Sequence, residues 1–175
     1  MSHPAPDPQQ ARRLAIAPRG GAIGSQVTVG MAGAAPKASI RIAFANLQAY
    51  ELIHTVVTDA DGNFTTQVKV PDWAVTDQVH YFFANPGNQQ PRAFSDGFHV
   101  TAPDGTANVQ GTLGDDVEGC VELRNADGVL YNLVGDVGTW SPGEHVTVTG
   151  SIAGPSGCGE GVAIEVHGIS RAPQG

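Results

Sequence analysis

Short apolar runs, separated by turn-forming residues, restrict the fold of this chain more than any other feature. Seven runs precede residue 102, at residues 14–17, 26–29, 40–44, 52–58, 64–70, 79–84 and 94–101. Glycine, proline and aspartate separate them, for example at Gly20-Gly21 and Asp61-Gly62. No segment keeps the apolar spacing of an amphipathic helix. The pattern predicts the strands of a β-sandwich over residues 14–101.

Five further strands are predicted after a break at residues 102–106, which we interpret as a linker because proline and glycine interrupt pairing there. They lie at Val109–Leu113, Cys120–Arg124, Val129–Val134, Val146–Ile152 and Val162–Ile169. Five short strands in so small a segment favour a closed barrel of OB-like or SH3-like type over residues 107–171, because closure removes exposed edges. The expected fold class is all-β, with a flexible segment at residues 1–13 before the sandwich.

The chain has two cysteines, Cys120 and Cys158, and each adjoins glycine. A disulfide between them would imply an oxidising compartment and would stabilise a small domain by about 3 to 4 kcal/mol on the chain-entropy model. Two free thiols, as in a cytosolic protein, are the alternative. A zinc site is less favoured because the chain has no CxxC pair, and a nucleophilic cysteine lacks its usual histidine context.

The net charge of −8 is unevenly distributed along the chain. Residues 1–103 carry seven acidic and seven basic side chains, whereas residues 104–175 carry ten acidic and two basic ones. Because phosphate backbones are bound mainly through lysine and arginine, we expect no nucleic-acid partner. No apolar stretch reaches the ~20 residues of a membrane span. The first residues lack the features of a signal peptide, so either a signal has been removed or none was present.

Two resemblances add to this interpretation. A proline-and-glycine entry before Val27-Thr28-Val29, the segment Asp59-Ala60-Asp61-Gly62-Asn63-Phe64 and the phrase Val68-Lys69-Val70-Pro71 make residues 14–101 resemble bacterial immunoglobulin-like repeats of the IPT/TIG kind. The second part resembles a small bacterial domain of unknown function. Its pattern is a cysteine strand, an Asp-Gly hairpin before Tyr-x-Leu, a Gly-Glu-x-Val-x-Val-x-Gly strand, and a second cysteine before the last strand. These resemblances imply a fold and no activity.

Two acidic segments are candidates for binding a cation. Residues 59–63 resemble part of a calcium loop, but an EF-hand would place glycine and glutamate where Phe64 and Val70 stand. A β-hairpin turn is favoured there, and residues 125–128 repeat the same turn chemistry. Asp115, Asp116 and Glu118 form the densest acidic cluster, for which a solvated loop is favoured over weak calcium binding. We expect no metal and no cofactor.

The histidines and the large aromatic side chains are expected to have structural roles. The histidines are predicted at exposed strand positions without chelating spacing: His54, His80, His99, His145 and His167. The sequence contains no nucleophile elbow, P-loop or complete dinucleotide fingerprint. Trp73, Trp140 and Tyr50 could together form a sugar-stacking surface. The favoured alternative is that Trp140 plugs one end of the barrel and Trp73 caps the sandwich.

Three classes of function follow. The leading hypothesis is a non-catalytic extracellular or cell-envelope binding or structural module with a protein or glycan partner. The alternative is a structural subunit of a filament, phage tail or injection assembly. Such a subunit would form homo-oligomers and would be located in an assembled particle. A carbohydrate-binding protein is a second alternative. The third is an enzyme with Asp115, Asp116 and Asp136 at the barrel mouth. We expect that the chain is not an enzyme and that it has no catalytic residues.

Overall fold

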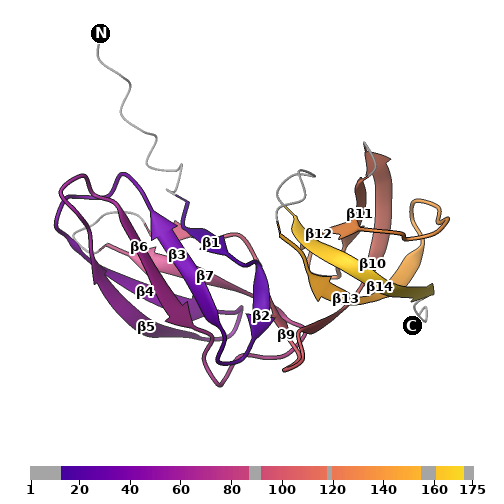
Figure 1. The fold of residues 1–175 in the computed structure, drawn as a ribbon, viewed down its shortest axis with the longest axis horizontal. Coiled ribbons are helices and arrows are strands. Elements are labelled where there is room, and N and C mark those ends of the chain that lie inside the picture. Colours follow the sequence, from indigo (N-terminus) through magenta and orange to yellow (C-terminus); the bar gives the residue numbers. More distant parts are fainter. Residues whose placement is uncertain (1–12, 87–91, 118–119, 155–160, 172–175) are drawn as a thin grey trace, which may run out of the picture. The chain divides into compact units, whose positions relative to one another are not determined.

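The computed structural model describes residues 13–86, 92–117, 120–154 and 161–171 (Figure 1). These residues form fourteen β-strands and no helix, so the prediction of an all-β fold is confirmed. Within the same residues no helix is long and apolar enough to cross a membrane.

Two compact units divide the chain, and neither is continuous in sequence. Unit 1 consists of Met1–Ala17, Val27–Val68 and Tyr81–Asp96. Unit 2 consists of Pro18–Gln26, Lys69–His80 and Gly97–Gly175. Segments that precede the expected linker therefore belong to the same unit as the barrel. The division at residues 14–101, 102–106 and 107–171 stays a prediction.

Unit 1 contains most of two sheets. The three-stranded sheet has the order β1-β3-β6, with β1 (Ala15–Ala17), β3 (Gln26–Met31) and β6 (Phe64–Lys69). The second sheet contributes the paired strands β4 (Ser39–Ala45), β5 (Tyr50–Val57), β7 (Val79–Asn85) and β8 (Ala93–Phe94). Alternate side chains of β3 and β4 are fully buried and form the core: Val27, Val29, Ile40, Ile42 and Phe44. This period of two is what places a second set of β4 side chains on the opposite face.

Unit 2 is built around a closed five-stranded barrel with the order β10-β11-β12-β14-β13, as the sequence predicted. Its strands are β10 (Thr106–Val117), β11 (Cys120–Arg124), β12 (Leu130–Val134), β13 (His145–Ile152) and β14 (Val162–Arg171). The pairing of β12 with β14 is parallel, and the other pairings in the barrel are antiparallel. Inward-facing side chains such as Leu123, Val146 and Ile164 are fully buried and fill the barrel.

The expected turn at Gly20-Gly21 is wrong, because these residues form strand β2 (Gly20–Ala22). This strand pairs in parallel with β9 (Phe98–Thr101). A Cβ atom at Gly20 would lie 2.6 Å from Ile152 Cδ1 and 2.7 Å from the His99 carbonyl oxygen. Glycine is therefore required here for a close approach between segments distant in sequence, and not for a reversal of the chain. The expected strand at 94–101 is interrupted at residues 95–97, giving β8 and β9.

The hairpin expected at residues 59–63 is also wrong, because β5 and β6 belong to different sheets. The turn chemistry itself is present. Asp59 Oδ1 accepts hydrogen bonds from the backbone N–H groups of Asp61 and Asn63, each at 2.9 Å, and Gly62 has φ +81°. At residues 125–128, in contrast, the hairpin prediction is confirmed, since β11 and β12 pair antiparallel on either side of the turn.

The expected linker at residues 102–106 is a tight turn between β9 and β10. The Ala102 N–H donates to the Thr106 carbonyl at 3.0 Å, and Asp104 Oδ1 accepts from the Thr106 N–H at 2.9 Å. The Thr106 N–H lowers the pKa of the Asp104 carboxyl by stabilising its ionised form. Gly105 completes the turn with φ +88°.

Candidate functional site

An aromatic cluster covers the face of strands β5, β4, β7 and β8 that is opposite to the buried core side chains. Cross-strand pairing arranges it in rows. The first row is Tyr50, Ala45 and Tyr81, and the second is Leu52, Ala43, Phe83 and Phe94. We call these two rows the aromatic face. All its residues belong to unit 1.

Phe83 lies at the centre of the aromatic face and is 4% exposed. The rings of Tyr50 and Phe94 are each centred 5.7 Å from the Phe83 ring, and that of Tyr81 is centred 6.4 Å away. The guanidinium carbon of Arg92 lies 5.1 Å from the ring centroid of Phe83, a cation–π distance. Tyr50 is nevertheless 63% exposed and Phe94 43% exposed. The cluster is thus a packed platform that keeps aromatic surface in contact with solvent.

Tyr50 is the one residue of this cluster that is a candidate from the sequence; its partners are not among the predicted site residues. A signal was present in strand β7. Phe82 and Ala84 are buried on the core side, and Tyr81 and Phe83 are apolar on the other side. A strand with apolar residues on both faces is typical of a strand that is covered on both faces. The bulky residues on the second face could therefore have been identified as a candidate contact surface.

The three aromatic residues that could have formed one sugar-stacking surface, the less favoured interpretation, lie in separate surroundings. Tyr50 packs on Phe83 in unit 1. Trp73 lies in unit 2 with its ring centred 6.1 Å from the His80 ring. Trp140 packs against the barrel core, which agrees with its interpretation as a plug.

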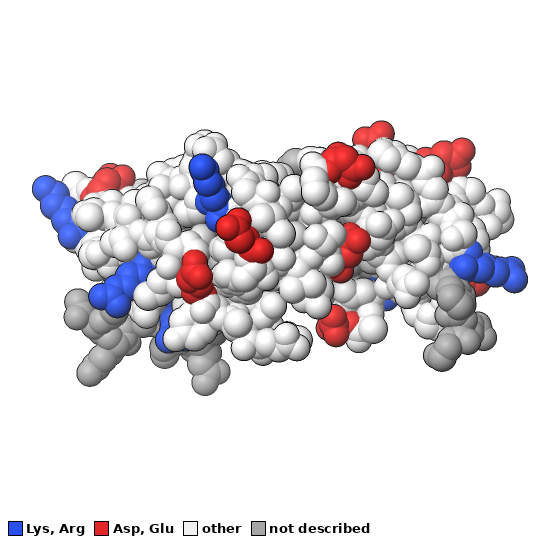
Figure 2. Space-filling view, turned by 90° about the horizontal axis from the view of Figure 1, so that it is seen from below, with Lys and Arg blue, Asp and Glu red and all other residues white. Residues whose placement is uncertain are grey.

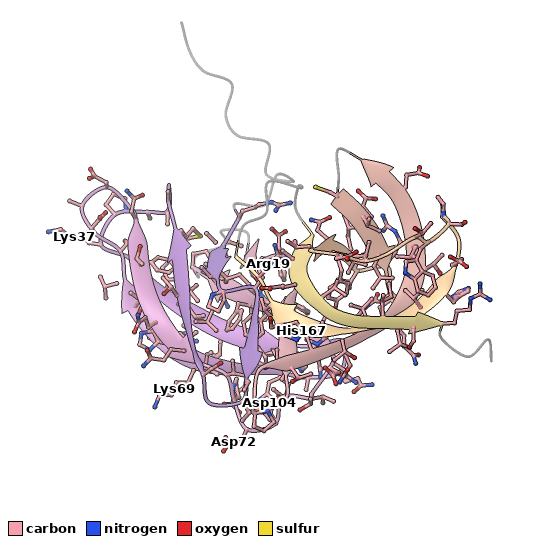
Figure 3. All side chains as sticks on the ribbon, turned by 45° about the vertical axis from the view of Figure 1, so that its right-hand side comes forward. Arg19, Lys37, Lys69, Asp72, Asp104 and His167 are labelled. Carbon is pink, nitrogen blue, oxygen red and sulfur yellow. The ribbon has the colours of Figure 1, made fainter. Side chains whose placement is uncertain are left out.

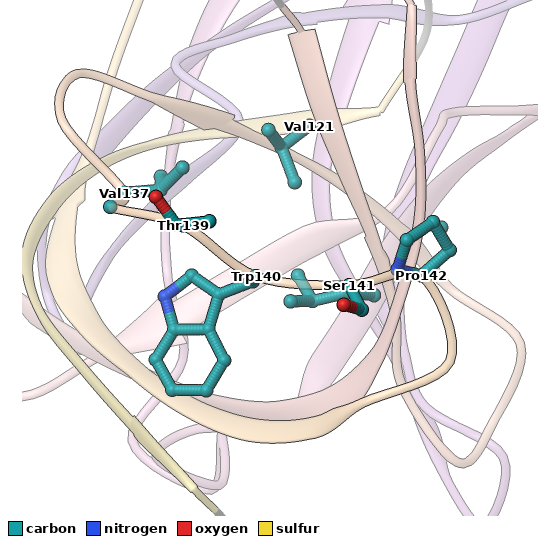
Figure 4. A pocket seen from close by; sticks show the side chains of 9 residues that line it. Val121, Val137, Thr139, Trp140, Ser141 and Pro142 are labelled. Atoms are coloured by element: carbon teal, nitrogen blue, oxygen red, sulfur yellow. The ribbon is translucent and has the colours of Figure 1, made fainter.

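A cavity of about 270 Å³ opens beside Trp140 at one end of the barrel (Figure 4). Its lining combines apolar side chains with polar groups, among them the hydroxyl groups of Thr139 and Ser141. No carboxylate is among the lining residues that the structure describes. Trp140 is therefore placed beside a cavity of mixed polarity and small-molecule size, and the described lining residues supply no acid–base group.

The structure does not gather the acidic candidates into a site. Asp115 and Asp136 are exposed, and Asp136 Oδ1 accepts a hydrogen bond from the Gly138 N–H at 3.0 Å. The side chain of Asp116 and the whole of Glu118 lie outside the described residues. Among the side chains that are described, no group of three or more His, Cys, Asp or Glu could hold a metal ion.

The prediction that the histidines are exposed is wrong for His80 and His99, which are 0% and 1% exposed. His99 Nδ1 lies 2.9 Å from the Tyr131 hydroxyl, and its Nε2 lies 3.0 Å from Asp77 Oδ1. Burial lowers the pKa of His99, against the opposing effect of Asp77, and burial raises the pKa of the Tyr131 hydroxyl. A neutral His99 fits this network, with Tyr131 donating to Nδ1 and Nε2–H donating to Asp77.

Further bonds hold this network in place. Asp77, a non-glycine residue with φ +63°, also accepts a hydrogen bond from the Asn108 N–H at 3.0 Å. His80 accepts from the Val75 N–H at 3.3 Å, and burial lowers its pKa. His80, His99 and Tyr131 are buried with hydrogen-bond partners, whereas Asp77 is exposed, and we assign the network to stability.

The other three histidines in the described part of the chain are exposed, as expected: His54, His145 and His167. His167, marked in Figure 3, lies on β14 with its Nε2 3.5 Å from the Ser151 hydroxyl. Cys120 begins strand β11, and Cys158 lies outside the described residues. The disulfide between them stays a prediction.

Charged side chains lie singly or in small groups over a mostly uncharged surface in the view of Figure 2. No protein-family model and no curated protein matches the chain. Among solved structures, macromomycin is similar over 52% of this chain and 100% of its own, with 18% sequence identity and a TM-score of 0.43. The proposed relation to IPT/TIG-like repeats therefore stays a prediction.

Proposed function

We propose that this protein is a non-catalytic, carbohydrate-binding module of the cell envelope or extracellular space, and that it contacts its glycan through the aromatic face. One observation carries the proposal. Tyr50 and Phe94 remain 63% and 43% exposed although they pack around a buried Phe83. Such a platform matches the C–H face of a sugar ring, which is apolar while its edge is polar. The two alanines between the aromatic side chains are 0% and 1% exposed, so the exposed rings around them form the part of the platform that a sugar ring can contact.

The size of the aromatic face favours a glycan over a folded protein. Its rows cross four strands spaced about 4.8 Å apart, and adjacent rows are separated by about 7 Å. The platform therefore measures on the order of 150 Å², whereas a stable protein interface takes about 800 Å² from each partner. A ligand that gains its affinity from a few stacked rings is consistent with the smaller area.

The architecture supports a binding module without specifying the ligand. The barrel order β10-β11-β12-β14-β13 with a parallel β12–β14 pair favours an OB-like over an SH3-like barrel. We further propose that the two remaining sheets form the Ig-like sandwich. Both folds serve many functions, so the ligand must be inferred from the surface itself.

Glycan binding by Tyr50→Ala tests the proposal. The wild-type protein is screened against immobilised glycans, and the affinity of each bound glycan is then measured by calorimetry. We expect Tyr50→Ala to weaken binding at least about tenfold, since it removes an aromatic stacking partner. Val75→Ala removes exposed apolar surface in unit 2 and is the control, with no expected change. Equal affinity of wild type and Tyr50→Ala would contradict the assignment to this face.

The open edge of β5 favours a second candidate, a subunit of an assembly. Among the described strands this eight-residue strand is last in the order of its sheet and pairs only with β4. An exposed edge offers backbone groups to another strand. Val57, 62% exposed on β5, provides the test through Val57→Lys. A mass that rises with concentration by light scattering, and that Val57→Lys returns to the monomer value, would support assembly.

A further inference from the structure

A polar row runs beside the aromatic face on the same side of the sheet. Arg41 pairs with Thr55 on β5 and with Asn85 on β7. Arg92 immediately precedes Ala93, which pairs with Ala84, so the register places Arg92 beside Asn85 at the end of this row. The two arginines are separated by two strand spacings, about 10 Å. The surface thus has an apolar part and a cationic border about one row spacing away.

No carboxylate neutralises this border among the described residues. Neither Arg41 nor Arg92 forms an ion pair there, whereas Arg13 and Arg171 pair with Asp96 and Glu144. The alternate positions of β4, β5, β7 and β8 that share the aromatic face contain no Asp or Glu. Glu51 pairs with the core residue Phe44 and therefore lies on the opposite face of the sheet from the aromatic face. A chain of net charge −8 therefore carries a locally positive surface at its most aromatic position.

We infer that the glycan bound at the aromatic face is acidic, a polysaccharide that carries carboxylates on its sugar rings. This inference rests on the proposed function. The C–H face of one ring stacks on the exposed aromatic side chains, and the carboxylate at the ring edge accepts hydrogen bonds from a guanidinium. Arginine suits this role because its planar fork matches a carboxylate. The contact of Arg92 with the Phe83 ring restricts the guanidinium before the ligand arrives, so less conformational entropy is lost on binding.

Single-stranded nucleic acid also binds to aromatic residues and arginines, but its affinity depends on many cations along the backbone. This surface supplies two arginines within a chain of net charge −8. The charge pattern therefore favours a uronate polymer, and nucleic acid becomes an outcome of the test.

Polygalacturonate and its fully methyl-esterified form are the matched probes, because they share the same sugar ring and differ in charge. We expect the wild-type protein to bind the acid form at least tenfold more tightly than the ester. Arg92→Gln and Arg41→Gln should each reduce this preference several-fold. Lys69→Gln, which removes one positive charge from an exposed position on β6, should leave it unchanged. Its position is marked in Figure 3.

The outcomes separate the two proposals. Equal binding of acid and ester, lost in Tyr50→Ala, would overturn the inference on acidity and leave the proposed function standing. Tighter binding of a thymidine oligonucleotide than of polygalacturonate would overturn it in favour of nucleic acid. An equal loss of preference in Lys69→Gln would show that net charge acts in place of the two arginines. Binding of neither polymer nor any neutral glycan would overturn the proposed function as well.

Discussion

Replacing Tyr131 by phenylalanine removes one buried hydroxyl group and tests the importance of the Asp77–His99–Tyr131 network. The hydroxyl lies 2.9 Å from His99 Nδ1, and both side chains are 1% exposed. Phenylalanine keeps the ring and its packing in the barrel core. His99 Nδ1 would then be a buried acceptor without its donor. Such a group costs about 1 to 3 kcal/mol, and we expect the free energy of unfolding to fall by that amount.

Urea unfolding followed by tryptophan fluorescence measures this loss. Trp73 and Trp140 both belong to unit 2, as do Tyr131 and His99, so the signal reports the unit in which the bond is broken. With a urea m-value of about 2 kcal/mol per molar, the midpoint should fall by roughly 0.5 to 1.5 M at an unchanged m. Tyr50→Phe is the control, because its hydroxyl belongs to a side chain that is 63% exposed and the expected change is below about 0.5 kcal/mol. An unchanged midpoint for Tyr131→Phe would refute the reasoning, since it would mean that the bond has no net energetic value.

Three further predictions concern stability. Burial lowers the folded-state pKa of His80 and His99 below 6.5, so the unfolded chain binds more protons in acid than the folded chain does. The free energy of unfolding should therefore have its full value above pH 6.5 and should decrease as the pH falls below 6.5. Urea titration at several pH values measures this decrease. Gly62→Ala should destabilise unit 1 by more than about 1 kcal/mol, because φ is +81° and the new Cβ would overlap the Ala34 carbonyl oxygen; calorimetry would detect a lower melting temperature. Asn132 is fully buried, and its side-chain nitrogen and oxygen have no hydrogen-bond partner among the described residues, so Asn132→Leu should be neutral or stabilising, and a clear loss of the urea midpoint would count against this.

The positions of the strands were predictable because side-chain alternation is a local property of the sequence. Their partners were not. Asp59 forms the expected turn, yet the strands on either side of it join different sheets. The role of Gly20 depends on Ile152, which packs where its side chain would be. Turn residues encode a local backbone conformation, and long-range packing decides which elements the turn connects.

The candidate site was also only partly predictable from the sequence. The apolar residues on both faces of β7 are visible in the sequence, whereas the rows on the aromatic face depend on the register of four strands. His99 was misassigned because its partners, Asp77 and Tyr131, are 22 and 32 residues away. Periodicity indicates which side chains share a face, but it does not indicate which buried polar groups will satisfy one another.

The charge distribution makes the salt dependence of polyuronate binding informative. The acidic surplus comes from residues 104–175, while residues 1–103 are balanced. At physiological ionic strength the Debye length is about 8 Å, so the direct contacts of Arg41 and Arg92 act on the ligand and more distant acids are screened. At low salt the net charge of −8 opposes the same ligand. We therefore expect affinity for polygalacturonate to change little between 10 and 100 mM NaCl and to fall above that range, as measured by calorimetry. A steep, continuous loss from the lowest salt, as for a polycation that binds nucleic acid, would contradict recognition by two local arginines.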